Sequence, residues 1–171
     1  MKKIPNSKFQ IPNKIQNPNS KFQKIGFTLI ELLVVISIIG ILASLALASY
    51  TGAQKQTRDT QRKSDLAQYR NALENYAAAN NGLYPLMTTP NTVSNICGSG
   101  KPLDSKFIAS CPDDPVSTQH YFYGSSSDRT RYVLYADLET VGSSTNRGFW
   151  YVCSNGQTGT KDSYPTISDC P

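Results

Sequence analysis

The chain has 171 residues, which is room for one modest domain, and its formal net charge of +5 is spread unevenly. Six lysines and no acidic residue precede Gly26, which leaves 11 basic and 12 acidic residues, a net charge of −1, in the remainder. A body without a basic excess argues against nucleic-acid binding, so no nucleic-acid partner is predicted.

Residues 1–26 are rich in Asn, Lys and Pro, and the hexapeptide Pro-Asn-Ser-Lys-Phe-Gln begins at Pro5 and again at Pro18. A segment of this composition cannot bury a core, so we expect a disordered leader. Positive charge beside a membrane segment favours the cytoplasmic side. The charge pattern therefore predicts a cytoplasmic leader and an exported remainder.

Residues 27–50 are almost entirely apolar, with no proline and with Glu31 as the one charged residue. A helix of this length spans roughly 36 Å at ~1.5 Å per residue, enough to cross a bilayer core of ~30 Å. We predict a transmembrane helix. A secretory signal peptide is the nearest alternative, and the small residues between Ala43 and Ala48 leave cleavage there open.

Residues 51–81 continue as an amphipathic helix. One stripe at three- and four-residue steps holds Leu66, Tyr69, Leu73, Tyr76 and Asn80, which predicts a face packed on a sheet. The charged residues Arg58, Arg62, Lys63, Arg70 and Glu74 are expected largely on other faces. The helix should stop at the sequence Asn80-Asn81-Gly82, because Asn and Gly adopt the left-handed cap readily.

Residues 82–171 are predicted to form a globular head. Residues 82–115 read as a loop with a short helix near Leu103–Ser110, and residues 154–171 as a tail. Aromatic and β-branched runs at 121–123, 132–138 and 148–152 predict three antiparallel strands, with room for a fourth, separated by turns at 124–129 and 142–147. The expected fold class is α+β: a long N-terminal helix packed on a small antiparallel sheet.

The four cysteines all lie in the expected exported part and include no C-x-x-C spacing typical of zinc or redox sites. In an oxidising compartment two disulfides are expected. Three connectivities are possible, and we favour Cys97–Cys111 and Cys153–Cys170 because each closes a short loop. Free buried thiols are the alternative.

The hexapeptide Gly26-Phe27-Thr28-Leu29-Ile30-Glu31 resembles the class III signal of type IV prepilins and type II secretion pseudopilins. The similarity extends to about Pro85 and is greatest to major pseudopilins. It implies a pilin-like fold and cleavage after Gly26 by a prepilin peptidase, which also methylates the new N-terminus, Phe27. It further implies that Glu31 pairs with the N-terminal amine of a neighbouring subunit during filament assembly.

This resemblance predicts a structural subunit of a type IV pilus or a type II secretion-like pseudopilus, and not an enzyme. The implied partners are other pilin-like subunits, the peptidase, the inner-membrane assembly platform and the assembly ATPase machinery. The implied location is a single-pass membrane protein that moves into a filament in the periplasm or at the cell surface. The alternative is a membrane-anchored binding protein that uses a similar anchor without forming filaments.

Other candidate chemistry is weaker. His120 is the single histidine and adjoins an aromatic strand without a nucleophile motif, so a surface or half-buried strand histidine is expected. The pair Asp113-Asp114 before Pro115 reads as a solvated turn or half of an acid pair. No cofactor is predicted, although a calcium site could draw on acidic residues of the strand region: Asp128, Asp137, Glu139 and Asp162.

Overall fold

The computed structural model describes residues 26–143 and 146–171. It forms two compact units, one ending at Ile41 and the other running from Leu42 to Pro171, and the head lies in the second. The predictions for the leader before Gly26 fall outside the described residues. The predicted α+β class is confirmed, since one long N-terminal helix and a five-stranded antiparallel sheet are present.

Helix α1 runs from Leu29 to Ala79. It ends at the predicted stop, where Asn81 (φ 58°) and Gly82 (φ 78°) both take left-handed conformations. The amide of Gly82 then donates to the carbonyl of Ala77 at 2.8 Å, which satisfies one of the last helical carbonyls. The Asn-Asn-Gly signal therefore ends the helix by the mechanism expected from its residue types.

The predicted stripe on α1 is the face that packs on the sheet. Leu66, Tyr69 and Leu73 are at most 1% exposed, and Tyr76 is partly buried. The prediction was wrong for Arg62, which is completely buried. It lies four residues before Leu66, so helical geometry places it on the same stripe.

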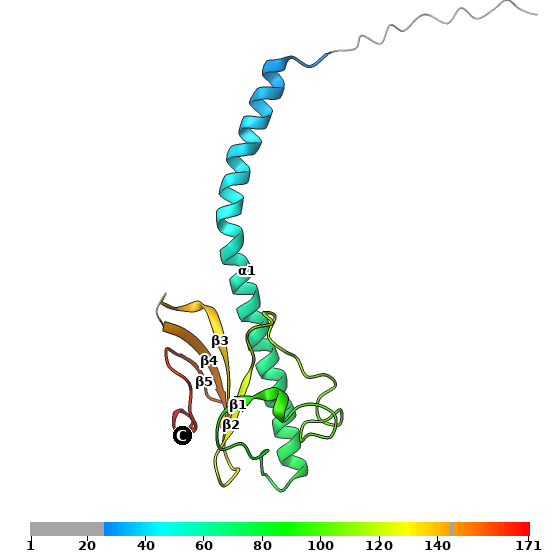
Figure 1. Ribbon diagram of the computed structural model, residues 1–171, viewed down its shortest axis with the longest axis vertical. Coiled ribbons are helices and arrows are strands. Elements are labelled where there is room, and N and C mark those ends of the chain that lie inside the picture. Colours follow the sequence, from blue (N-terminus) through cyan, green and yellow to red (C-terminus); the bar gives the residue numbers. More distant parts are fainter. Residues whose placement is uncertain (1–25, 144–145) are drawn as a thin grey trace, which may run out of the picture. The chain divides into compact units, whose positions relative to one another are not determined.

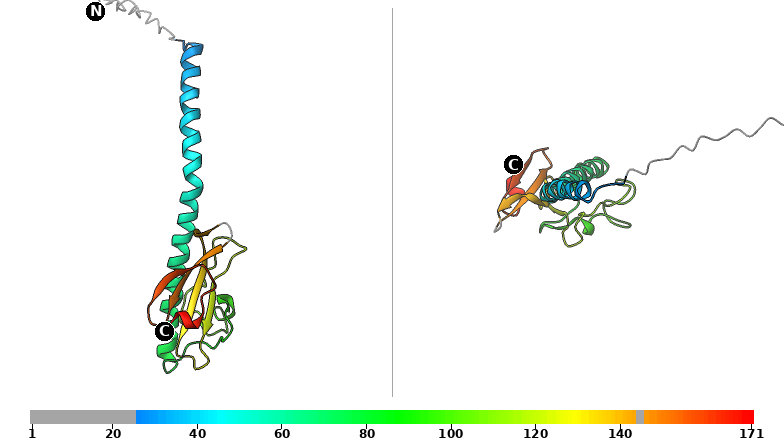
Figure 2. Two further views of the ribbon diagram at one scale, coloured as in Figure 1. Left: turned by 90° about the vertical axis from the view of Figure 1, so that its left-hand side faces the viewer. Right: turned by 90° about the horizontal axis from the view of Figure 1, so that it is seen from above.

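The sheet has the order β1-β2-β3-β4-β5, and every neighbouring pair is antiparallel. Its strands are β1 (Asn91–Thr92), β2 (Phe122–Ser125), β3 (Tyr132–Ser143), β4 (Asn146–Cys153) and β5 (Thr158–Lys161). Two short 3-10 helices, η1 (Val93–Asn95) and η2 (Ile167–Asp169), complete the head. The strands lie beside the C-terminal part of α1 in two perpendicular views (Figures 1 and 2).

Side chains alternate between the two faces of the sheet. Tyr132, Leu134 and Ala136 of β3 join the core against α1, whereas Val133 and Tyr135 belong to a second cluster on the other face. This second cluster also includes Phe149, Cys153 and Cys170. The C-terminal tail therefore covers the outer face, and the sheet has a core on both sides.

The structure corrects the expected strand count and one helix. Strand β1 has two residues and falls in the expected loop, and β5 falls in the expected tail. Residues 103–110 do not form a helix: Leu103 pairs with Cys97 in an isolated parallel bridge, residues 105–107 form a turn and residues 109–110 a bend. The expected turns also shrink, since β2 continues to Ser125 and the β3–β4 pairing reaches Ser143 and Asn146.

Gly159 shows why β5 carried little sequence signal. Strand β5, Thr-Gly-Thr-Lys, has no large apolar residue, and Gly159 pairs with Tyr151 of β4. A Cβ at Gly159 would lie 2.8 Å from the Tyr151 hydroxyl oxygen, so the tyrosine occupies the space above the glycine. The strand is recognisable only once its partner strand is known.

Candidate functional site

The hexapeptide Gly26–Glu31 marks the start of α1. Residues 26–28 precede the helix and are exposed. The carboxylate oxygen Oε2 of Glu31 accepts hydrogen bonds from the Thr28 amide (2.9 Å) and the Thr28 hydroxyl (2.8 Å). The Glu31 amide donates to Thr28 Oγ1 at 3.3 Å. Thr28 and Glu31 thus form a reciprocal capping box at the helix N-terminus.

The capping box is a role for Glu31 that the sequence analysis missed. The Thr-x-x-Glu spacing before an apolar run was the available signal. The box satisfies one carboxylate oxygen and the backbone amide of Thr28 within a single chain. Gly26 differs, because a Cβ built there would meet nothing within 4 Å. Packing within residues 26–143 and 146–171 therefore gives no reason for a glycine at position 26.

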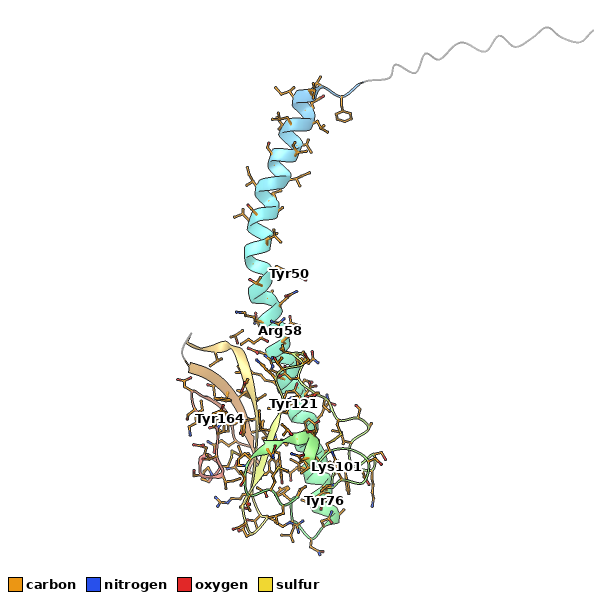
Figure 3. All side chains as sticks on the ribbon, viewed as in Figure 1. Tyr50, Arg58, Tyr76, Lys101, Tyr121 and Tyr164 are labelled. Carbon is orange, nitrogen blue, oxygen red and sulfur yellow. A yellow bond between two sulfur atoms is a disulfide. The ribbon has the colours of Figure 1, made fainter. Side chains whose placement is uncertain are left out.

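The apolar side chains that follow are exposed. Phe27 is 85% exposed and Leu29 is 89% exposed, and the side chains before Tyr50 stand out from the helix (Figure 3). Phe27, Ile30, Glu31, Val34 and Val35 line one shallow hollow on this surface. An 18-residue window in α1 has a mean hydropathy of 2.7, so the helix is long and apolar enough to cross a membrane.

A second polar site lies inside the head, where Arg62 joins α1 to two other segments. Its guanidinium binds Asp114 through two parallel hydrogen bonds, Nε to Oδ2 at 2.7 Å and Nη2 to Oδ1 at 2.9 Å. Nη1 contacts Asp59 at 2.7 Å and Glu139 at 2.9 Å, and Nη2 donates to Gln119 at 2.8 Å. These contacts use all five donors of the guanidinium.

Asp59 links the same cluster to β3. Its carboxylate accepts hydrogen bonds from the amides of Glu139 and Thr140 and from the Thr140 hydroxyl, where the β3–β4 register shifts. Across this irregularity Gly148 lies so close to Val141 that a Cβ would be 2.5 Å from the Val141 carbonyl oxygen. The charged cluster therefore fixes the bulged part of β3 against α1.

Electrostatic interactions in this cluster favour the charged forms of Arg62 and Glu139. Burial opposes the charge of Arg62, but hydrogen bonds to Asp114 and Asp59 outweigh it and raise the pKa of the guanidinium. The hydrogen bond from Arg58 holds the pKa of Glu139 below its usual value. Asp65 behaves oppositely, because burial raises its pKa although the Tyr121 hydroxyl donates to it at 2.7 Å.

Two of the candidate calcium residues, Glu139 and Asp128, are engaged by other groups of the head. Glu139 pairs with Arg58 and Arg62. Asp128 is bound within its own turn by Ser126 and Thr130, and these hydrogen bonds lower its pKa to about 2. Within residues 26–143 and 146–171, no group of three His, Cys, Asp or Glu side chains could hold a metal ion.

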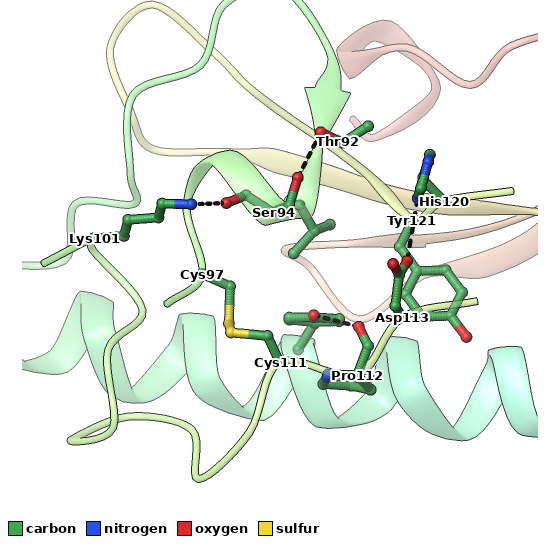
Figure 4. Close-up of a pocket in the computed structure, with 11 residues that line it drawn as sticks. Thr92, Ser94, Cys97, Lys101, Cys111, Pro112, Asp113, His120 and Tyr121 are labelled. Carbon is green, nitrogen blue, oxygen red and sulfur yellow. Dashed lines mark hydrogen bonds and ion pairs between the residues drawn. A yellow bond between two sulfur atoms is a disulfide. The ribbon is translucent and has the colours of Figure 1, made fainter. Parts of the chain in front are cut away.

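The pair Asp113-Asp114 is split by the fold. Asp114 is buried against Arg62, whereas Asp113 is exposed and lies 3.3 Å from His120 Nδ1. His120 precedes β2 and is exposed, in line with the expected surface histidine. Asp113 and His120 line a cavity of about 140 Å³ (Figure 4). Its other lining residues include Lys101, Tyr69, Tyr121 and the disulfide-bonded Cys97 and Cys111.

The structure contains both disulfides that the sequence analysis favoured. Cys97 is bonded to Cys111 and Cys153 to Cys170, with Cα–Cα distances of 5.9 and 5.4 Å. The first closes the loop between η1 and Pro112, and the second attaches the C-terminal tail to the end of β4. Closing loops of 14 and 17 residues stabilises the head by restricting the unfolded chain.

Known proteins are similar to this chain at its N-terminal motif and over a longer stretch of sequence. Residues 22–47 match the prokaryotic N-terminal methylation motif. Type II secretion system core protein G of Pectobacterium carotovorum is 32% identical over 59% of this chain and 67% of the relative. Core protein G of Aeromonas hydrophila is 33% identical over 56% of this chain and 69% of its own length.

The type IV major alpha-pilin of Moraxella bovis is 39% identical over 40% of this chain and 42% of its own length. No solved structure is significantly similar. Two core G proteins exceed 30% identity over two thirds of their own length, and the methylation motif coincides with the start of α1. The chain therefore belongs to the family of type II secretion pseudopilins and type IV pilins.

Proposed function

We propose that the chain is a structural subunit of a type IV pilus or a type II secretion-like pseudopilus. The observation that carries this proposal is the hexapeptide Gly26–Glu31 at the start of an exposed apolar helix, in a chain similar to core protein G over two thirds of that protein. The proposed steps are insertion with a cytoplasmic leader, removal of residues 1–26, methylation of Phe27 and assembly into a helical filament.

The backbone around Gly26 is suited to a processing site. Gly26 and Phe27 lie outside the helix and are exposed, so the peptide bond between them is not protected by helical hydrogen bonds. A glycine that no contact with the described part of the chain requires is compatible with a close approach by the peptidase. The proposed partner in this step is a prepilin peptidase.

Assembly would use the same segment after processing. Cleavage leaves the amine of Phe27 as a cation at the edge of an apolar surface. The two hydrogen bonds that Glu31 accepts from Thr28 both use Oε2, which leaves Oε1 for the amine of a neighbouring subunit. An unpaired charge in an apolar environment is costly, so this pairing would select one stagger between subunits.

The proposed location and partners follow from this role. The subunit would wait in the inner membrane with its head exported. Other pilin-like subunits, an assembly platform and an assembly ATPase would then move it into a filament in the periplasm or at the cell surface. The exposed apolar side chains of residues 27–50 would exchange lipid for neighbouring helices.

The test is to identify the mature N-terminus and the filament in one preparation. Mass spectrometry of the membrane-extracted protein should find methylated Phe27, and filaments sheared from cells should contain this chain. An N-terminus beyond residue 40 would indicate ordinary signal peptidase and reject the proposal. Methylated Phe27 in membranes, with no filament under any expression condition, would favour a plain membrane anchor.

Replacement of Glu31 by glutamine separates its two roles. The Gln amide oxygen can still accept from Thr28, so helix capping, membrane insertion and processing should persist. The negative charge opposite the neighbour's amine is lost, and this should cost several kcal/mol and reduce filament yield at least about tenfold. Glu31→Asp is the matched control, because it keeps the charge on a shorter side chain. Normal filament yield from Glu31→Gln would reject the assembly role.

A further inference from the structure

The two disulfides of the head differ in their access to solvent. Cys153 and Cys170 are 0% and 1% exposed, and they lie in the core on the outer face of the sheet. Cys97 is 4% exposed, but its partner Cys111 is an exposed residue. Cys111 lines two separate hollows of the surface, one shared with His120 and one within its own loop. A thiol from solvent can therefore reach one disulfide and not the other.

The loop closed by the accessible disulfide is attached by a few hydrogen bonds and by Phe107, whose ring packs edge-on against Tyr76 of α1 at 5.3 Å. On one side it is anchored at Leu103, which is fully buried and whose amide donates to the Ile96 carbonyl at 2.8 Å. On the other side the Tyr69 hydroxyl donates to the Pro112 carbonyl at 2.6 Å. Between these anchors, the Phe107 and Ile108 amides both donate to Asp104 in the same loop. Opening the disulfide would therefore remove the covalent closure at Cys111 and leave the sheet intact, while Phe107 and Ile108 remain packed against the core.

The cavity beside the disulfide favours exchange. Lys101 contributes a basic side chain to its wall, and its ammonium donates to the Ser94 carbonyl (Figure 4). Positive charge in the surroundings of a disulfide favours the thiolate that leaves when it is attacked, and Lys101 lines the same cavity as both cysteines. The carboxylate of Asp113 on the same wall acts in the opposite sense, but it is engaged by His120 at 3.3 Å.

We propose that Cys97–Cys111 is an exchange site for thiol–disulfide oxidoreductases, attacked at Cys111, whereas Cys153–Cys170 is purely structural. The attacking thiolate bonds to Cys111 Sγ, the Sγ–Sγ bond breaks, and Cys97 leaves with the electron pair and takes up a proton. The second thiol of the partner then attacks the mixed disulfide. Its dithiol is oxidised to a disulfide, and both cysteines of the loop become thiols. This inference goes beyond the proposed filament role and does not depend on it.

The test uses the full-length chain in detergent, dithiothreitol as the reductant and alkylation at timed intervals. Peptide mass spectrometry then reports each cysteine separately. Cys97 and Cys111 should be alkylated together, at least about tenfold faster than Cys153 and Cys170, because rates follow access. Equal rates, or faster reduction of Cys153–Cys170, would overturn the proposal.

Two further measurements exclude an indirect route. Urea below the unfolding midpoint should accelerate reduction of Cys153–Cys170, which requires unfolding, and leave the Cys97–Cys111 rate nearly unchanged. A parallel increase of both rates would show that Cys97–Cys111 also opens only by global unfolding, and would reject the proposal. With glutathione as a monothiol probe, the trapped adduct should lie on Cys111. An adduct on Cys97 alone would overturn the proposed direction of attack.

Discussion

The N-terminal and C-terminal parts of α1 use apolar side chains for different purposes. Up to Tyr50 the large apolar residues are exposed, among them Leu42 at 61% and Leu45 at 65%. From Leu66 onwards one stripe is buried, with Leu66 and Leu73 fully inaccessible. The apolar side chains of the first part therefore form an exposed surface, whereas those of the second part form the core of the head.

The charged residues of the two parts of α1 also differ in burial, and in how far along the sequence their partners lie. In the first part Glu31 is exposed, and its contacts are with Thr28, three residues earlier in the sequence. In the second part Arg62 is buried and contacts residues more than 50 positions away in the sequence. The contacts of the charged residue in the first part therefore stay at the helix end. Those of the second part join the helix to the sheet and to the loop at residues 112–120.

The largest effect should come from removing the buried cation. Arg62→Leu keeps an apolar side chain on the stripe but leaves Asp114 and Asp59 without their shared partner. Breaking a buried ion pair from one side costs about 3–5 kcal/mol, and urea unfolding of the head should show a loss of this size. Lys55→Leu, on an exposed face of α1, is the control and should change stability by less than about 0.5 kcal/mol.

An equal cost for the two variants would mean that the Arg62 cluster does not hold the head together. The expected secondary effect is local: the bulged part of β3 loses its anchor because Asp59 is no longer fixed by Arg62. Hydrogen exchange should therefore increase first at Glu139 and Thr140.

A leucine-to-alanine pair on one helix tests the comparison directly. Leu73→Ala leaves a cavity in the core and should lower the free energy of unfolding by about 2–5 kcal/mol. Leu42→Ala removes the same atoms from an exposed position and should leave the unfolding of the head unchanged within about 0.5 kcal/mol. A stability loss at Leu42 comparable to that at Leu73 would show that the N-terminal part contributes to the head.

Local sequence signals predicted the helix, its end and the central strands well. The stripe, the Asn-Asn-Gly stop and the aromatic runs each depend on residues close in sequence. Strands β1 and β5 were missed because two residues of β1 and the Thr-Gly-Thr-Lys of β5 carry little intrinsic strand preference. Their pairing depends on neighbours that become adjacent only in the folded chain.

The buried ion pair was likewise not predictable from residues close in sequence. Arg62 was expected, with four other charged residues, largely on faces other than the stripe, although its spacing to Leu66 places it on the stripe. Its partner Asp114 lies 52 residues away, and no local pattern connects the two. The capping box at Thr28 and Glu31 was predictable, since both residues lie within four positions.

Asp65 offers the smallest and most selective test of the buried part of α1. Burial raises the pKa of its carboxyl, so ionisation is less favourable in the folded head than in the unfolded chain. The head therefore loses stability from this group as the pH rises from the unfolded pKa, near 3.8, through the folded pKa. Asp65→Asn removes the ionisation and keeps an oxygen for the Tyr121 hydroxyl. The variant should gain a little stability at pH 7, and this gain should shrink towards zero below about pH 4. Urea unfolding of both proteins at pH 3, 5 and 7 measures the difference, in which the acid-sensitive contributions of Asp59 and Glu139 cancel. A loss of stability that is the same at every pH would instead assign the effect to a damaged hydrogen bond.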